Sequence, residues 1–390
     1  MKKVILIAMM LCTVLCMSGC SDTVPVSTEQ VSTGGATSKK YSGSFAYLIT
    51  EEGNAVIEEY SGTEQRVSIP ASIDGYTVTA ISSQAFKSST ITQIALPDTI
   101  HSINDNPFSN CENLALVSVS PDHPTLATID GVLFSKEDKT LVCYPRRHQP
   151  IYYSIPEGIL SIGNNAFKNA STVASIDIPS SVAKIGDYAF YGCSNVEDID
   201  IPSQVTYIGK YAFAEMDELE KVYNFYAIEI NTLPEGLFSG CGSLRSVNIP
   251  STVTSIGDFA FQTCISLWDV DLPSGLKTIG SDAFCGANLG TLDLPQSLET
   301  IGTFAFLLNN RLDEVTIPEG TEKIWDAAFM DCKNLRDVSL PASLTHIGDS
   351  AFKNCSNGLV FTVPRNSYAA QYCKENGFSY VYPDVSDWLN

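Results

Sequence analysis

Short apolar runs alternate with polar residues along most of the chain, and one pattern returns every 22 to 25 residues. In a representative unit, Ile199 and Ile201 alternate with Asp198 and Asp200, and Pro202 follows directly. A period of two predicts a short β-strand with one buried face, and proline ends such a strand because it cannot continue the ladder. Each unit therefore begins with a short strand.

Two independent markers carry this period. The first is an Ile/Leu-Pro pair, with Pro156, Pro179, Pro202, Pro250, Pro273, Pro295, Pro318, Pro341 and Pro364. The second is an Ala-Phe-like pair, with Phe86, Phe108, Phe167, Phe190, Phe213, Phe238, Phe261, Phe284, Phe306, Phe329 and Phe352. One unit cannot bury its own apolar residues, whereas stacked units share a continuous apolar column. The pattern predicts a repeat solenoid of about eleven or twelve coils, with short parallel strands and irregular or short helical returns.

The consensus Leu-x-x-Ile-x-Ile-Pro-x-x-Val-x-x-Ile-Gly-x-x-Ala-Phe-x-x-Cys, as in Leu244 to Cys264, resembles the BspA-like branch of leucine-rich repeats. The resemblance covers about residues 43 to 383. It implies coils of about 23 residues and an N-terminal hairpin cap near residues 44–80. The resemblance also implies a secreted or surface protein that takes part in adhesion to host or extracellular matrix proteins. Residues 359–383 depart from the repeat, so we expect a C-terminal cap there, with a short closing helix from Tyr368 to Glu375.

The N-terminus is predicted to be an export signal rather than part of the fold. Two lysines and an apolar run too short for a membrane span precede Met17-Ser18-Gly19-Cys20, which resembles a lipoprotein signal. We expect a signal peptide at 1–19, lipidation of Cys20 and a Ser/Thr-rich tether over 20–43, with a plain secretory signal as the alternative. The solenoid then spans 44–383, and 384–390 form a C-terminal tail.

A formal net charge of −21 limits the partners of the chain. Such a surface repels nucleic acid and anionic lipid, so a lipid anchor is the expected contact with a membrane. The exported protein is then held on the bacterial membrane and exposed at the cell surface. Basic proteins and cations are attracted to it.

The sequence lacks the motifs of common enzymes. It has no nucleophile elbow, no phosphate-binding glycine loop and no zinc-protease motif, and its four histidines lie far apart. We therefore expect no catalytic activity, no cofactor and no metal centre. Six cysteines follow the marker phenylalanine by three residues, where other units have small or soft residues. They are predicted to be buried free thiols rather than disulfide partners.

The open face of the predicted strands carries the candidate ligand-binding residues. Between the buried strand positions lie Asp177, Asp200, Asn248, Asp271 and Asp293, with Asp198 and Asp269 one row over. Parallel strands place equivalent residues about 4.8 Å apart, so carboxylates in such a column repel each other. The column is either screened by solvent or compensated by a basic ligand or a divalent cation such as calcium.

An irregular coil interrupts this face where Val222-Tyr223-Asn224-Phe225-Tyr226 lacks the Ile-Pro pair. By register, Tyr223 replaces an aspartate of the column and, with Tyr226 and Trp268, forms an aromatic patch suited to protein or sugar recognition. The alternative is a distorted coil whose aromatic rings repack into the core.

Two further departures from the repeat are candidates for partner contact. A hairpin insert near residues 122–153 has a turn at Asp130-Gly131 and ends in the basic cluster Arg146-Arg147-His148. Its alternative is a structural insert with a solvated turn. Trp325 replaces the glycine of other units, which implies that this position does not require a positive φ. An isolated exposed aromatic of this kind is usually neutral.

Taken together, the residues favour a non-enzymatic cell-surface binding protein that uses the open strand face for adhesion or protein–protein interaction. The expected partner is a host, extracellular matrix or other surface protein. A glycan-binding accessory lipoprotein and a passive structural surface protein are the alternatives.

Overall fold

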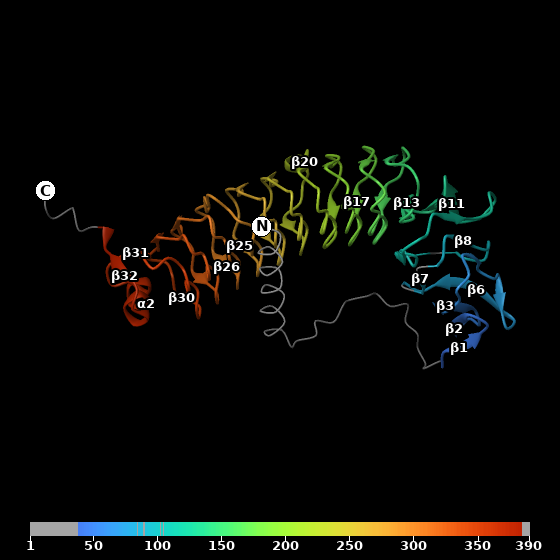
Figure 1. Ribbon diagram of the computed structural model, residues 1–390, viewed down its shortest axis with the longest axis horizontal. Helices are drawn as coiled ribbons and strands as arrows, with labels where there is room; N and C mark the ends of the chain where they lie inside the picture. The colour runs from blue at the N-terminus through green and yellow to red at the C-terminus, as the bar shows by residue number, and fades with distance from the viewer. Residues whose placement is uncertain (1–37, 84, 89, 102, 104, 384–390) are drawn as a thin grey trace.

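The computed structural model describes residues 38–383 except 84, 89, 102 and 104. The predicted signal peptide, Cys20, most of the tether and the tail lie outside the described residues. The described chain forms an elongated, curved solenoid (Figure 1) of about 14 turns with ~23-residue spacing. The predicted eleven or twelve coils were too few because some turns lack the phenylalanine marker. Tyr60 and Tyr144 take its place, stacking on Phe86 and Phe167 with ring centroids 5.3 and 4.7 Å apart.

The first ladder contains the predicted strands, each with a buried or partly buried middle residue. Its members are β14 (Tyr152–Ser154), β16 (Ser175–Asp177), β18 (Asp198–Asp200), β20 (Lys221–Tyr223), β22 (Ser246–Asn248), β24 (Asp269–Asp271), β27 (Glu314–Thr316), β29 (Asp337–Ser339) and β31 (Val360–Thr362). Strands pair in parallel and in register within β14–β16, β18–β20, β22–β24 and β27–β29–β31. The outer residues of these strands form the open face.

The returns are more regular than predicted. The Ile-Gly segments form a second parallel ladder of β13 (Thr140–Cys143), β15 (Ser161–Ile162), β17 (Lys184–Ile185), β19 (Tyr207–Ile208), β21 (Thr232–Leu233), β23 (Ser255–Ile256), β25 (Thr278–Ile279), β26 (Thr300–Ile301), β28 (Lys323–Ile324) and β30 (His346–Ile347). Helix is confined, within the described residues, to the 3₁₀ turn η1 (Phe225–Ala227) and to α2 (Tyr368–Asn376). Apart from these short strands, the returns consist of turns, in agreement with the irregular returns expected, and main-chain hydrogen bonds between turns satisfy their backbone.

A third side of each turn, around the Ala-Phe pair, is also held by main-chain hydrogen bonds. The N–H groups of Tyr188, Phe190 and Gly192 donate to three alternate carbonyls of the next turn at 2.9, 2.8 and 2.9 Å. Tyr188 and Gly192 have φ values of 54° and 69°, in the left-handed region. This conformation aims alternate N–H groups at the neighbouring turn, although it is unfavourable for tyrosine.

The main core runs inside the stack as a column of rings, and in several turns a side-chain donor bonds the turn to the one before it. Phe284 and Phe306 stack with centroids 5.5 Å apart. The Cys193 thiol donates to the Phe167 carbonyl at 3.2 Å, and burial raises the pKa of this thiol to about 12. None of the nine cysteines that the structure describes takes part in a disulfide. The cysteine position thus holds a hydrogen-bond donor as well as a small apolar group.

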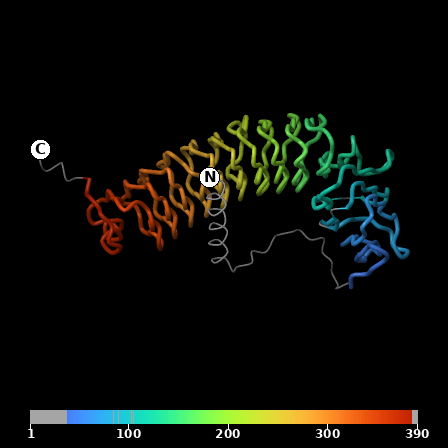
Figure 2. Tube along the Cα trace, in the orientation of Figure 1, coloured from blue at the N-terminus to red at the C-terminus, as the bar shows by residue number. Residues whose placement is uncertain are grey.

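The hairpin insert is a junction between two cores rather than a protrusion. Its strands β11 (Leu126–Ile129), β12 (Val132–Ser135) and β13 follow one another in antiparallel order, and the predicted turn is present, with φ values of 50° at Asp130 and 86° at Gly131. Val132 and Phe134 pack into the main core, whereas Leu133 packs into the N-terminal core. Figure 2 shows the stack changing direction near this segment.

Both ends of the described solenoid are capped. The N-terminal part comprises β1 (Lys40–Ser42), β2 (Phe45–Ile49), β3 (Ala55–Tyr60), β4 (Arg66–Ser68), β5 (Ser72–Ile73), β6 (Tyr76–Ile81), β7 (Lys87–Ser88), β8 (Gln93–Ala95), β9 (Asn110–Cys111) and β10 (Leu116–Ser118). At the other end, α2 begins at the cap Ser367, whose hydroxyl accepts from the N–H of Ala370, and ends at Gly377 with φ 71°. The strand β32 (Ser379–Val381) then extends the first ladder. Among the described helices, none has the length and apolar character of a membrane span.

Candidate binding surface

The open face of the first ladder displays the residues predicted for ligand binding. Asp177, Asp198, Asp200, Tyr223, Tyr226, Asn248, Trp268, Asp271 and Asp293 are exposed, and Asp269 is partly exposed. Asp293 lies in a turn that forms no strand, so it extends the face without belonging to the ladder. The predicted residues are thus on one accessible surface of the solenoid.

Strand register places Tyr223 in the aspartate column. In the β18–β20 pair, Tyr223 lies beside Asp200, and Lys221 lies beside Asp198. Adjacent parallel strands bring such neighbours close enough to interact. The sequence reading did not include Lys221, although it occupies the same row as Asp198 one turn later. An aromatic ring and a cation therefore interrupt the acidic face at one point.

The aspartates are better separated than a continuous acidic column would be. The paired strands place Asp177 beside Ser154, Asp269 beside Ser246 and Asp271 beside Asn248. None of these pairs sets two carboxylates side by side, so the expected repulsion is reduced there without a bound ion. Only the β27–β29 pair, among the paired strands of this ladder, places one carboxylate, Glu314, beside another, Asp337. No group of three or more His, Cys, Asp or Glu in the described part of the chain has the arrangement of a metal site.

The irregular coil divides its aromatic residues between the core and the surface. Phe225 is buried and contacts Phe238 edge-to-face at 5.6 Å, whereas Tyr223 and Tyr226 are 45% and 61% exposed. Asn224, with φ 56°, opens η1, and its side-chain amide donates to Asp200 Oδ1 at 2.7 Å. The predicted exposed patch therefore describes Tyr223 and Tyr226, and the alternative, aromatic rings repacked into the core, describes Phe225. The exposed rings are fixed in position by the buried one.

Trp268 lies immediately before β24 and is 53% exposed. It is two turns and three residue positions from Tyr223, about 10 Å along the stack and about 10 Å along the strands. Between the two aromatics, Arg245 forms an ion pair with Glu220 at 3.0 Å. Trp268 and Tyr223 therefore share a face but stand at separate points on it.

Sequence reasoning also missed Tyr152, the first residue of β14, which is 77% exposed. Register places it beside Ser175, in the row that continues to Asp198. The signal was present, because Ile155-Pro156 marks the end of a strand and so places residues 152–154 on the ladder. The predicted insert, near residues 122–153, included the first two residues of this strand.

The other two departures from the repeat lie elsewhere. His148, in the basic cluster, is buried and contacts the Tyr144 ring edge-to-face at 5.0 Å, while Arg147 is exposed. Trp325 is 40% exposed beside the second ladder, 5.1 Å from the ring of His346. The structure thus places Trp325 beside the second ladder, whereas the basic cluster lies just before β14 with its histidine buried.

The glycines equivalent to Trp325 do not have a positive φ, in agreement with the sequence reading. Glycine recurs at this position of the repeat for another reason. A Cβ on Gly348 would lie 2.4 Å from the main-chain nitrogen of Asp326, because neighbouring turns approach closely there. Close packing of backbones, rather than backbone conformation, therefore favours glycine at this position.

The ladders, the ~23-residue turns and the aromatic column define a leucine-rich repeat solenoid. A model of the BspA type leucine rich repeat region matches residues 65–153, 143–230 and 231–358, in six copies. The chain belongs to this family. No match is found among curated proteins.

Solved structures show the same fold. A leucine-rich repeat protein from Eubacterium ventriosum is 22% identical, with a TM-score of 0.58 over 73% of this chain and 97% of that one. The pneumococcal vaccine antigen PcpA is 19% identical, with a TM-score of 0.56 over 90% of this chain and 99% of that one. At these identities the likeness extends to architecture alone.

Proposed function

We propose that the chain is a non-enzymatic surface protein that binds a protein partner through the open face of its first ladder. One observation carries the proposal: register places the exposed Tyr223 beside Asp200, with Lys221 beside Asp198, on an accessible β-surface. Mixed aromatic and charged groups of this kind provide binding energy and specificity at protein interfaces. The partner is a host, extracellular matrix or other surface protein with a basic contact region.

The absence of catalysis belongs to the same proposal. The regular positions of each turn are used in packing. His123, which is buried, accepts hydrogen bonds through Nδ1 from the N–H groups of Thr125 and Leu126 at 3.3 and 3.1 Å. Burial also lowers the pKa of this histidine, which favours its neutral form. Its role is to hold the chain in the turn that precedes β11.

A test measures binding of the full chain to immobilised matrix proteins and to a glycan panel. The triple variant Asp200→Ala, Tyr223→Ala, Asp271→Ala should weaken protein binding at least about tenfold, since aromatic and charged anchors commonly contribute more than 1 kcal/mol each. Higher salt should weaken it further if the partner is basic. The matched control removes one tyrosine and two carboxylates away from the face: Glu157→Ala, Tyr207→Ala, Glu322→Ala.

The outcomes separate the candidate functions. Equal loss in both triple variants, or binding unchanged by the first, would contradict the proposed surface. Binding of sugars alone, lost with Tyr223→Ala or Trp268→Ala, would identify the glycan-binding alternative. No binding to either panel would favour a passive structural role.

The same proposal includes export and lipid anchoring through Cys20. Acyl chains on Cys20 would hold the protein on the bacterial membrane while the tether displays the solenoid. Cys20→Ser should abolish incorporation of labelled palmitate and release the protein to the medium. Retention of the label in this variant would refute the assignment, and release of the unmodified wild-type protein would favour the secretory alternative.

A further inference from the structure

The third side of the solenoid ends differently from the other two. From Asn165 to Asp331, alternate N–H groups on this side donate to carbonyls of the following turn. In the last such pair of turns, Ala327, Phe329 and Asp331 donate at 2.9, 2.8 and 2.8 Å. The equivalent donors one turn later belong to Ser350, Phe352 and Asn354, and none of these N–H groups has an acceptor among the described residues.

The C-terminal cap covers the two other sides of this turn. β32 pairs with β31 and so continues the first ladder. At the second ladder, the N–H of Ile347 donates to the Tyr368 hydroxyl oxygen of α2 at 3.4 Å. No described residue covers the third side in this way, and its row of donors lines a cavity of about 560 Å³.

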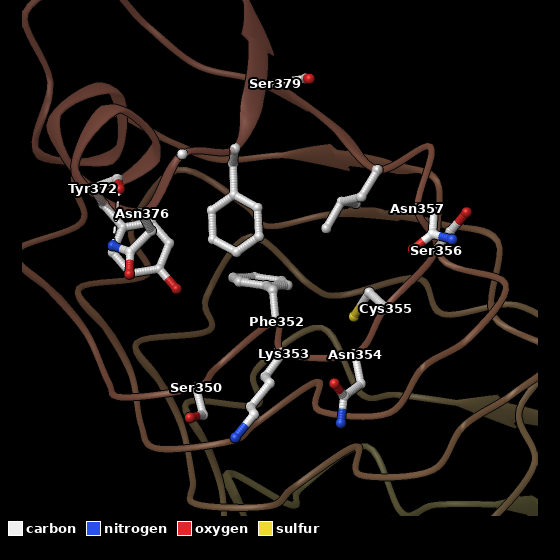
Figure 3. A pocket seen from close by; sticks show the side chains of 13 residues that line it. Ser350, Phe352, Lys353, Asn354, Cys355, Ser356, Asn357, Tyr372, Asn376 and Ser379 are labelled. Carbon is white, nitrogen blue, oxygen red and sulfur yellow. Dashed lines mark hydrogen bonds between the residues drawn. The ribbon is translucent and has the colours of Figure 1, made fainter.

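This cavity, the end pocket, lies between the last Ala-Phe turn and the segment that joins α2 to β32. Figure 3 shows Phe352 and Cys355 in its interior, with Asn357 and Asn376 on opposite sides. Lys353 is the only charged residue among those that line it. The end pocket therefore offers main-chain donors, polar side chains and one cation.

We propose that the end pocket binds a peptide segment of a partner protein in the conformation of a further turn, with its main-chain carbonyls accepting from Ser350, Phe352 and Asn354. Each turn from Asn165 to Asp331 shows the same three donors already occupied by alternate carbonyls of the following turn. An unpaired row of main-chain groups can be completed by the main chain of another segment, as happens when a peptide adds to the edge of a sheet. This site is independent of the open strand face.

The side chains of the pocket restrict the sequence of the peptide. Phe361 contacts Phe352, and Phe378 contacts Phe361, at 5.0 and 5.1 Å between ring centroids, so the aromatic column is already closed. The peptide therefore carries a small residue where a further turn would carry phenylalanine. Lys353 favours an acidic side chain near this residue.

A labelled heptapeptide, Gly-Asp-Tyr-Ala-Ala-Tyr-Gly, is a suitable probe. It copies residues 186–192 with Phe190→Ala, and in the chain the carbonyls of Asp187, Ala189 and Tyr191 accept from the preceding turn at 2.9, 2.7 and 2.7 Å. Binding to the full chain is measured by fluorescence anisotropy, and amide hydrogen exchange by NMR. Bound peptide should slow exchange at Ser350, Phe352 and Asn354 about tenfold or more. The already paired amide of Phe329 should not change.

Two pairs of variants test the location. Asn357→Trp places a large ring at the rim and should reduce affinity at least about tenfold, whereas Asn334→Trp, its equivalent one turn earlier, should not. Lys353→Glu should reduce affinity about fivefold, whereas Lys374→Glu on α2 should not. The charge variants are at exposed positions and so remain informative if the tryptophan variant folds poorly.

Several results would overturn the proposal. These are the absence of peptide binding, protection of amides outside the last turn, or equal effects within each pair of variants. Self-association blocked by Asn357→Trp would assign the pocket to a second copy instead. Binding of a free glycan that competes with the peptide would assign it to sugar.

Discussion

The donor position of the repeat leads to a specific stability prediction for Asn309, which replaces cysteine in its turn. Asn309 is fully buried and its amide donates to the carbonyls of Phe284 and Phe306 at 2.8 and 3.0 Å. Its side-chain oxygen accepts from the N–H of Leu289 at 2.9 Å. A thiol in this position, such as that of Cys264, makes one bond, to the Phe238 carbonyl at 3.1 Å.

Asn309→Ala should therefore destabilise the protein more than Cys264→Ala. It leaves the N–H of Leu289, which is 0% exposed, without an acceptor, and leaves the Phe284 carbonyl without its side-chain donor. Unsatisfied buried groups cost about 1–3 kcal/mol each, so we expect a loss of about 3 kcal/mol. Cys264→Ala should cost about 1.5 kcal/mol, for one weak hydrogen bond and a small cavity. Asn309→Cys should be intermediate, at about 2 kcal/mol, because it restores only the bond to Phe284.

Urea unfolding followed by circular dichroism would compare the variants, and amide exchange would locate the effect. Each turn contacts its neighbours, so exchange should increase around Leu289 and Phe284 before it increases in distant turns. Equal costs for Asn309→Ala and Cys264→Ala would refute the reasoning, since they would mean that the amide contributes only volume. A uniform increase in exchange along the solenoid would contradict its local character.

Three other properties are testable. Ala327 has a φ of 52°, so Ala327→Gly should raise the free energy of unfolding by up to about 1 kcal/mol. Its neighbour is the control, because Ala328→Gly should lower the free energy of unfolding by about 1 kcal/mol. Thermal denaturation would show whether the two changes have opposite signs. Burial holds the pKa of His123 below its usual value of about 6.5, so the unfolded chain binds a proton first and stability should fall as the pH drops below that value. His123→Gln should lessen this dependence, and an unchanged pH profile would exclude His123 as its source. Burial raises the pKa of Cys355 to about 12, yet this thiol is partly exposed, so iodoacetamide should modify it slowly but before Cys241; peptide mapping that finds the reverse order would contradict the placement.

The repeat was predictable because its signal is local and repeated. Residues such as Ile199 and Pro202 specify strand and strand end within one unit, and each further unit adds the same evidence. The second ladder was not predictable in this way, since β17 contains two residues, Lys184 and Ile185, too few for a visible alternation. Its strands exist because stacking brings equivalent residues together.

The candidate surface likewise combines features that follow from the local sequence with features that depend on stacking. The register of Tyr223 with Asp200 followed from counting positions, whereas the burial of Phe225 between two exposed tyrosines depended on contact with Phe238 in the next turn. Likewise, the open donors of the end pocket depend on how the cap sits over the last turn. Such features arise from tertiary contacts that no single unit encodes.

The hairpin between the two cores has a consequence for how this chain can vary. An ordinary turn packs against an equivalent turn on each side, so one turn can be duplicated or lost and the remaining turns still stack on each other. In β12, Val132 and Leu133 serve opposite cores, and shifting this strand by one residue would exchange the two sets of side chains. Gene duplication can therefore lengthen the solenoid on either side of the hairpin, while the hairpin itself stays a single, fixed joint.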